Sequence, residues 1–154
     1  MSSILDKYNK LTNFPGGRFL FNKAIGFAAP FFAKVHPNIK QLEVGLCVVE
    51  IKDRRSIRNH IGTINAGAMC TLAELTAGMA VDASIPKSLR WIPKQMCVAY
   101  LKKASGTLTA VCRFDASILQ PGDIEIPVQL LNSDNEKVFS ATIGFYISQK
   151  PAKP

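Results

Sequence analysis

One long apolar segment restricts what this 154-residue chain can fold into. Over residues 66–83 the polar side chains are few, namely Thr71, Glu74, Thr76 and Asp82. A helix that is apolar on every side belongs in the interior of a protein, because none of its faces can be turned to water. The segment therefore predicts a central helix over residues 65–83 that other elements must surround.

The remaining sequence supplies strands. Residues 41–52 alternate and are rich in Val and Ile, which is typical of a strand. After Pro93 the apolar residues recur with period two, as expected for half-buried antiparallel strands over 94–104, 107–118, 124–130 and 139–147. Turn signals at Ser105-Gly106 and at 121–123 separate the first three of these strands. We therefore expect one strand before the central helix and a four-strand antiparallel meander after it.

One face of that meander has to be covered, and residues 65–83 form the all-apolar element that can cover it. A sheet wrapped around a single helix is the economical solution, and this arrangement is the hotdog fold. We predict one α+β domain over residues 1–154. It comprises an N-terminal helical extension over 1–38, a hotdog core over 39–149 and a short tail over 150–154 that frays.

The N-terminal extension divides at a Pro-Gly-Gly breaker. Residues 1–13 predict a short polar helix or arm. Residues 18–35 are aromatic and basic, and they predict a helix of about three turns that ends near Pro30, followed by one further turn. This segment has two interpretations. It either packs on the main body, or it forms an interfacial helix or a lid over a hydrophobic ligand.

Charge and cysteine content limit the classes of partner. The formal net charge of +8 attracts anions such as nucleic acid, anionic lipid or a phosphorylated ligand. The sequence contains no zinc finger, RRM-type aromatic pair or basic helix, which argues against nucleic acid. Its four cysteines are widely spaced and form no CxxC or Cys/His cluster, so we expect no metal and buried free thiols. Free thiols, no apolar run of membrane-spanning length and no fitting secretory signal predict a cytoplasmic protein.

Short motifs around the start of the central helix resemble those of hotdog-fold acyl-CoA thioesterases of the phenylacetate-pathway type. They are NHIGT at 59–63, NAG at 65–67, and Glu74, which follows Asn65 by the nine residues that separate His and carboxylate in that family. With Ala73-Glu74 and YLKKA at 100–104, the chain is most similar to an uncharacterised bacterial subfamily of thioesterase-like proteins. The similarity implies hydrolysis of an acyl thioester carried by coenzyme A or a carrier protein, with no separate cofactor. Asn65 stands where the family has His, and Ala66 where it has Gly.

The start of the helix has the properties of an oxyanion hole. Its first N–H groups lack intrahelical partners and lie at the positive end of the helix dipole. Ala66 and Gly67 have very small side chains, so a substrate oxygen could approach these donors closely. Small residues also permit tight packing of a helix on a sheet, which is the structural alternative. Asn65 is itself a good N-cap.

Glu74 is the candidate catalytic acid. It shares one helical stripe with small or short side chains at Gly67, Cys70, Thr71 and Gly78. A lone carboxylate among apolar neighbours is costly unless it is hydrogen-bonded, protonated or open to water. We expect it to act as general base on water or as nucleophile on the thioester. The alternative is a solvent-facing or capped acid.

The spacing of the two candidate groups requires a second chain. Ala66 and Glu74 are eight residues apart, or about 12 Å along a helix axis at roughly 1.5 Å per residue. That distance is too long for both to act on one carbonyl. We therefore predict a homodimer, or a dimer of dimers, whose active sites combine donors from one chain with the acid of its partner.

Other residues have weaker assignments. The resemblance gives Asn59 a role in holding the nucleophilic water or the carbonyl, with a loop-stabilising Asn as the alternative. His60 is either a general acid or base or a loop hydrogen-bonder, and Thr71 either binds the acid or water or bonds back to the helix. Gly78 would leave space beside Glu74. Several cations could contact coenzyme A phosphates, although solvated charge is the simpler interpretation: Arg54, Arg55, Arg58, Lys102 and Lys103.

A rival hypothesis is a non-catalytic acyl or lipid binder on the same fold. This hypothesis is motivated by the departures from the family pattern at Asn65 and Ala66 and by the hydrophobic, basic N-terminal segment. A further option is peripheral contact with a membrane through residues 18–35. Five aromatic residues of that segment would suit a long or aromatic acyl chain, although plain core is the favoured interpretation for most of them: Phe19, Phe21, Phe27, Phe31 and Phe32.

Overall fold

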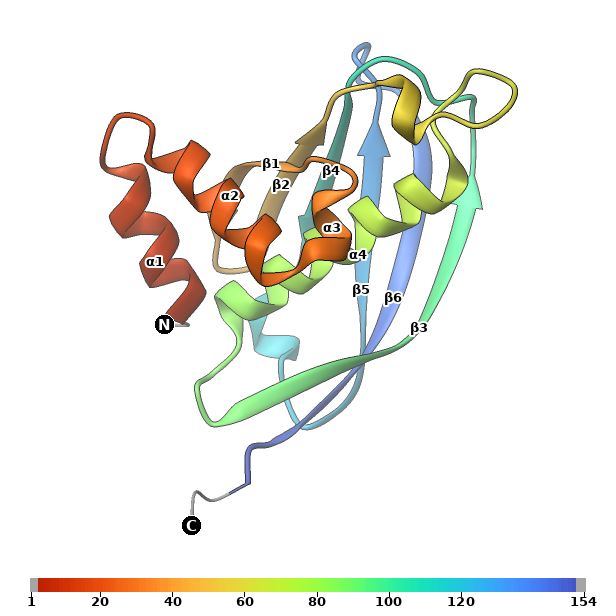
Figure 1. Ribbon diagram of the computed structural model, residues 1–154. Coiled ribbons are helices and arrows are strands. Elements are labelled where there is room, and N and C mark those ends of the chain that lie inside the picture. Colours follow the sequence, from red (N-terminus) through yellow and green to blue (C-terminus); the bar gives the residue numbers. More distant parts are fainter. Residues whose placement is uncertain (1–2, 152–154) are drawn as a thin grey trace.

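The computed structural model describes residues 3–151 and shows a curved antiparallel sheet that wraps around one long helix (Figure 1). The helices are α1 (Ser3–Thr12), α2 (Gly17–Ala28), α3 (Pro30–Ala33) and α4 (Ala66–Ser84), with 3-10 turns η1 (Arg55–Ile57) and η2 (Ala116–Ile118). The strands are β1 (Asn38–Glu43), β2 (Leu46–Ile51), β3 (Leu89–Tyr100), β4 (Leu108–Arg113), β5 (Gly122–Leu131) and β6 (Lys137–Gln149). They form one sheet in the order β1-β2-β4-β5-β6-β3. This is the predicted α+β hotdog fold.

The central helix forms where the apolar run predicts it. α4 spans residues 66–84 against the predicted 65–83, and most of its residues from Met69 to Ala83 are buried. It packs on β2, β4 and β5, whose inward side chains alternate with outward ones along each strand. Thr76 is fully buried on the helix, and its hydroxyl donates to the Leu72 carbonyl at 2.7 Å. The helix can therefore be surrounded without leaving that polar group unpaired.

The region predicted as one strand over 41–52 is a hairpin, so that prediction was wrong. β1 and β2 pair antiparallel and are joined by a turn at Val44-Gly45. Gly45 has φ +72°, and a Cβ there would lie 2.4 Å from the carbonyl oxygen of Phe114. Only glycine meets both demands, so Gly45 was the sequence signal for this turn.

The expected meander was also wrong in its connectivity. β3 pairs with β6 at one edge of the sheet, whereas β4 pairs with β2 and β5. Ser105-Gly106 therefore lies in a connection that carries the chain from that edge to β4, and it does not close a hairpin. Pro93 lies inside β3, where the pairing shifts register between Pro93 and Gln95. An edge strand with a bulge tolerates proline, because the missing N–H has no ladder to complete.

The remaining strand boundaries differ by a few residues. β4 ends at Arg113, and residues 116–118 form η2 in place of the last part of the predicted strand 107–118. The Asp115 side chain accepts from the Ser117 N–H at 2.9 Å and caps that turn. β5 and β6 follow the predicted alternation, and both run slightly further than expected.

The N-terminal extension is helical, as expected, with α2 followed by the single turn α3, which begins at Pro30. α1 packs against α2 and α4, and it buries Leu5 and Tyr8. The plain-core interpretation of the aromatic residues was wrong for three of the five. Phe21 is buried and Phe32 is half-buried, whereas Phe19, Phe27 and Phe31 are exposed. Residues 1–2 and 152–154, including most of the predicted frayed tail, lie outside the described part of the chain.

Candidate active site

The predicted cap at the start of α4 is present. Asn65 is the N-cap, and its Oδ1 accepts from the Gly67 N–H at 2.7 Å. Its carbonyl accepts from the Met69 N–H at 3.2 Å. The cap stabilises the helix start, but it also occupies one of the two N–H groups predicted to hold an oxyanion. Ala66, the other predicted donor, is exposed at the helix tip.

The NHIGT motif forms a tight turn immediately before the helix. The Asn59 and Thr63 backbones pair, with the Asn59 N–H donating to the Thr63 carbonyl at 2.8 Å, and Gly62 has φ +81°. The Asn59 Oδ1 accepts from the N–H groups of Ile61 and Thr63, both at 3.1 Å, and its Nδ2 donates to the Thr63 hydroxyl at 2.8 Å. The side chain of Asn59 thus stabilises the loop, whereas His60 and Ile61 are exposed at its tip.

A cavity of about 330 Å³ opens beside the helix start. Asn65, Gly67 and Thr71 line it from α4, while Phe31 and Val35 line it from α3 and the segment that follows. The Thr71 hydroxyl donates to the Gly67 carbonyl at 2.8 Å, which is the back-bonding alternative. The structure therefore brings together three of the predicted residues beneath the aromatic N-terminal segment.

Glu74 lies one turn further along α4 and is half-buried. Within residues 3–151 it has no hydrogen bond or ion pair. The stripe that contains Glu74 contacts the side chains of β3 at both ends. The Cys70 Sγ lies 3.4 Å from the Tyr100 hydroxyl, and a Cβ at Gly78 would lie 3.2 Å from the Trp91 ring. Glu74 is placed between these contacts, on the side of the helix that faces β3.

Gly78 has a packing role in this chain. It is buried, and it lets the Trp91 ring lie directly against the helix backbone. The Trp91 Nε1 donates to the Asp82 Oδ1 at 2.7 Å, and the ring meets Phe145 edge to face. Burial raises the pKa of Asp82, and the bond from Trp91 opposes that shift. The Trp91–Asp82 pair was missed from sequence, because no periodicity links a strand residue to a helix residue nine positions earlier.

The inner face of β3 is left uncovered. Met96, Val98 and Tyr100 pair with buried β6 residues, so they lie on the face of the sheet that holds the core. Nevertheless Tyr100 is 52% exposed and Val98 is 37% exposed. β3 also terminates the sheet, so it has one neighbouring strand. An apolar edge strand of this length offers a surface for a second chain.

The basic residues named from the sequence divide into those whose side chains are already bonded and those without an ion pair. Arg58 forms two hydrogen bonds with Asp53, at 2.8 and 3.1 Å, and holds the pKa of that carboxyl below its usual range. Arg54 donates to the carbonyls of Lys34 and Val35. Lys102 pairs with Glu136 at 2.6 Å, an exposed contact that contributes little stability. Arg55 and Lys103 are exposed, and no ion pair joins either to another described residue.

The thiols do not all share the predicted burial. Cys47 and Cys112 face each other across β2 and β4 and are fully buried, and burial raises the pKa of Cys112 to about 12. Cys70 is half-buried and Cys97 is exposed on β3. All four are free.

Comparisons with solved structures support the fold at full chain length. The structural-genomics protein APC5556 is 37% identical to this chain, and the match covers 96% of this chain and 99% of that one with a TM-score of 0.85. PA5026 from Pseudomonas aeruginosa, a protein of unknown function described as a "Probable Thioesterase", is 22% identical over 89% and 97%, with a TM-score of 0.77. Thioesterase HI1161 from Haemophilus influenzae is 11% identical over 88% and 92%, with a TM-score of 0.75. No curated protein matches the sequence.

The fold and these neighbours define a hotdog-fold protein. Residues 17–147 match the family described as "Domain of unknown function (DUF4442)", and the chain belongs to this family. No helix within residues 3–151 is both long and apolar enough to cross a membrane.

Proposed function

We propose that this protein is an acyl-thioester hydrolase whose active sites form between two copies of the chain. The observation that carries the proposal is the state of Glu74. It is a half-buried carboxylate without a partner among the described residues, on the stripe of α4 that faces the uncovered strand β3. A carboxylate without a partner, beside an apolar surface, is free to take a proton from a water molecule at that surface.

The chemistry requires one base and one set of oxyanion donors. Glu74 takes a proton from water, and the resulting hydroxide oxygen bonds to the thioester carbonyl carbon. The carbonyl oxygen becomes an oxyanion held by backbone N–H groups at the α4 start of the partner. Collapse of this intermediate breaks the C–S bond. The thiol leaves with the proton that Glu74 accepted, and the free acid remains. Direct attack by Glu74 would proceed through an anhydride that water then cleaves.

Ala66 is the donor that this arrangement uses first, because the Asn65 side chain occupies the Gly67 N–H. Gly67 becomes a second donor only if the Asn65 side chain turns away. An imidazole at residue 65 would be a weaker N-cap than Asn, so the departure at this position favours a closed cap. That closed cap also supports the rival hypothesis of an acyl binder that does not turn over.

The substrate is proposed as an acyl thioester of coenzyme A or of a carrier protein, without a separate cofactor. Among the cations named from the sequence, Arg55 and Lys103 are exposed and have no ion pair within residues 3–151, so they are free to contact phosphate. Lys34 is also exposed without an ion pair to another described residue, and it lines the cavity beside the helix start. Lys102 can do so only by leaving Glu136. The cavity beside Asn65, Gly67 and Thr71 is the proposed entry for the acyl group, with Phe31 beside it.

The decisive experiment is hydrolysis of short, long and aromatic acyl-CoAs by the wild type and by Glu74→Gln. We expect a fall in kcat of about 100-fold or more, because a positioned general base contributes on that scale. Unfolding in urea should change by less than about 0.5 kcal/mol, since Glu74 has no partner to lose. Asp134→Gln, at an exposed loop position, is the control and should keep full activity.

Two results would distinguish the alternatives. A wild type inactive on every acyl-CoA and on acylated carrier protein would remove the enzymatic proposal. If acyl ligand then co-purified with the protein, the non-catalytic binder would stand in its place. If Glu74→Gln keeps its activity, the general base must be another residue.

A further inference from the structure

The N-terminal extension carries an exposed aromatic face that the fold does not use. Phe19 is 63% exposed, Phe27 90% and Phe31 70%. On α2, Phe19 and Phe27 lie opposite the buried Phe21, and Leu20 is exposed beside them. A helix on a water-exposed surface normally turns polar residues outward. Large apolar side chains gathered on such a surface mark a contact with another phase or partner.

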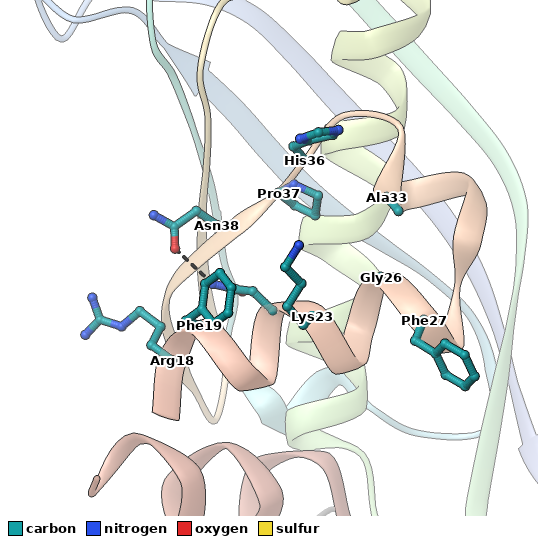
Figure 2. A pocket seen from close by; sticks show the side chains of 10 residues that line it. Arg18, Phe19, Lys23, Gly26, Phe27, Ala33, His36, Pro37 and Asn38 are labelled. Atoms are coloured by element: carbon teal, nitrogen blue, oxygen red, sulfur yellow. Dashed lines mark hydrogen bonds between the residues drawn. The ribbon is translucent and has the colours of Figure 1, made fainter. Parts of the chain in front are cut away.

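Cations surround the same face. Phe19 and Phe27 line a cavity of about 670 Å³ together with Arg18, Lys23 and His36 (Figure 2). The Lys23 Nζ lies 5.4 Å from the centre of the Phe19 ring. None of the ten residues that line this cavity is acidic. Across residues 3–38 there are five Lys and Arg against one Asp, a net charge of +4. The face therefore combines apolar bulk with an unopposed positive potential.

The floor of the cavity is held in place. The Asn22 Nδ2 on α2 donates to the Asn38 Oδ1 at 2.9 Å, and the Asn22 Oδ1 accepts from the Ile39 N–H at 2.9 Å. These bonds attach α2 to the first residues of β1. Figure 1 shows α2 beside α3 on the body of the protein. With these bonds, α2 presents its exposed aromatic residues from a fixed position.

A second copy of this chain is a poor occupant for the face. A two-fold contact would place this basic face against the same basic face of the partner, with no acid in the cavity to offset Arg18 and Lys23. A lipid surface matches both features of this face. Its anionic headgroups can pair with the cations, and its apolar interior, directly below the headgroups, can receive the aromatic side chains. Helices with this composition lie in the plane of the interface.

We propose that α2 and α3 bind the surface of an anionic phospholipid bilayer. Phe19, Phe27 and Phe31 enter the headgroup region, while Arg18 and Lys23 pair with lipid phosphate and carboxylate groups around the cavity. This inference does not depend on the hydrolase proposal, because Arg18, Phe19, Lys23 and Phe27 lie outside the cavity proposed as the acyl entry. Phe31 lines that cavity, and the variants below leave it unchanged.

Vesicle co-sedimentation of the full-length protein tests the proposal. Vesicles of phosphatidylcholine with added phosphatidylserine should bind the wild type, and vesicles of phosphatidylcholine alone should bind it at least tenfold more weakly. Arg18→Gln and Lys23→Gln should each lower the partition coefficient about fivefold, which corresponds to about 1 kcal/mol per charge at the surface. The double variant Phe19→Ser/Phe27→Ser should lower it about tenfold or more by removing the apolar contact.

Matched controls remove similar groups elsewhere. Val44→Ser takes an exposed apolar side chain from the β1–β2 turn, and Lys87→Gln takes an exposed cation from the end of the molecule near β3. Neither should change sedimentation by more than about twofold. Circular dichroism should be unchanged in the aromatic double variant, because Ser and Phe have similar helix propensities.

Several outcomes would overturn the proposal. These are absence of binding to anionic vesicles, equal binding of the aromatic variant and wild type, and equal binding to both vesicle types. A change of oligomeric state in Phe19→Ser/Phe27→Ser, seen by sedimentation velocity, would show that a second copy covers the face.

Discussion

At the scale of single residues, asparagine side chains decide the shape of the candidate site. Asn59 forms three hydrogen bonds within its own turn, and Asn65 caps α4. Both residues were identified from the sequence, and the N-cap was predicted correctly. The structure shows in addition that each side chain is already engaged, which a motif cannot reveal because it contains no information on which donors lie within reach.

Asp82 gives a residue-scale prediction on pH. Burial raises its pKa above the ordinary 3.8, so above that pH the folded chain binds more protons than the unfolded chain. Its contribution to stability therefore falls as the pH rises from the unfolded pKa through the raised folded pKa. Asp82→Asn keeps an oxygen for the Trp91 N–H and removes the titration. In urea unfolding from about pH 4 to about pH 7, the free energy of unfolding of Asp82→Asn should increase relative to that of the wild type as the pH rises.

The indole bond can be tested in the same series. Asp82→Ala leaves the Trp91 N–H without its acceptor and should cost about 1–2 kcal/mol near pH 4. This cost should become smaller as the pH rises, because the wild type then loses part of the contribution of Asp82. A wild type and Asp82→Asn that keep a constant difference across the range would show that Asp82 does not titrate as described.

At the scale of elements, the long apolar helix was predictable because its pattern is local. The pairing of β3 with β6 was not, since alternation identifies a strand without naming its neighbour. The turn at Gly45 could have been predicted from the sequence, because glycine is the residue that such a turn requires. It was missed because Leu42, Val44 and Leu46 continue the apolar alternation across it.

The start of α4 gives an element-scale prediction. Asn65→Ala removes the side-chain cap and should lower the free energy of unfolding by about 1 kcal/mol. The same change frees the Gly67 N–H. If that group helps to hold the oxyanion, kcat should be kept or raised despite the loss of stability.

Urea unfolding and acyl-CoA kinetics on the same protein measure both effects. Asn9→Ala, at an exposed position on α1, is the control. It should leave kcat unchanged and should not lower stability, because Ala has a helix propensity about 0.5 kcal/mol better than Asn. A parallel fall of kcat and stability in Asn65→Ala would instead indicate that the cap is needed to shape the site.

At the scale of the whole molecule, the hydrolase proposal requires a partner across β3. Val98→Lys places a charge on the uncovered inner face of that strand. We expect dissociation to monomers in sedimentation velocity and a parallel loss of hydrolysis, because burying an unpaired charge is costly. Val44→Lys makes the same change at the distant β1–β2 turn and should leave the dimer intact. A Val98→Lys variant that remains dimeric would place the interface elsewhere.

The sequence alone determined the class of fold, because an all-apolar helix and alternating strands have few ways to cover each other. It also provided Glu74, Asn65 and the small residues at the start of α4 as candidates for the site, since their spacing along one helix is a local property. The tertiary structure decided which strand lies at the edge, which donors are already bonded and which aromatic residues remain exposed. Those features depend on contacts between segments distant in sequence, such as Gly78 with Trp91 or Asn22 with Asn38. No local pattern encodes such contacts.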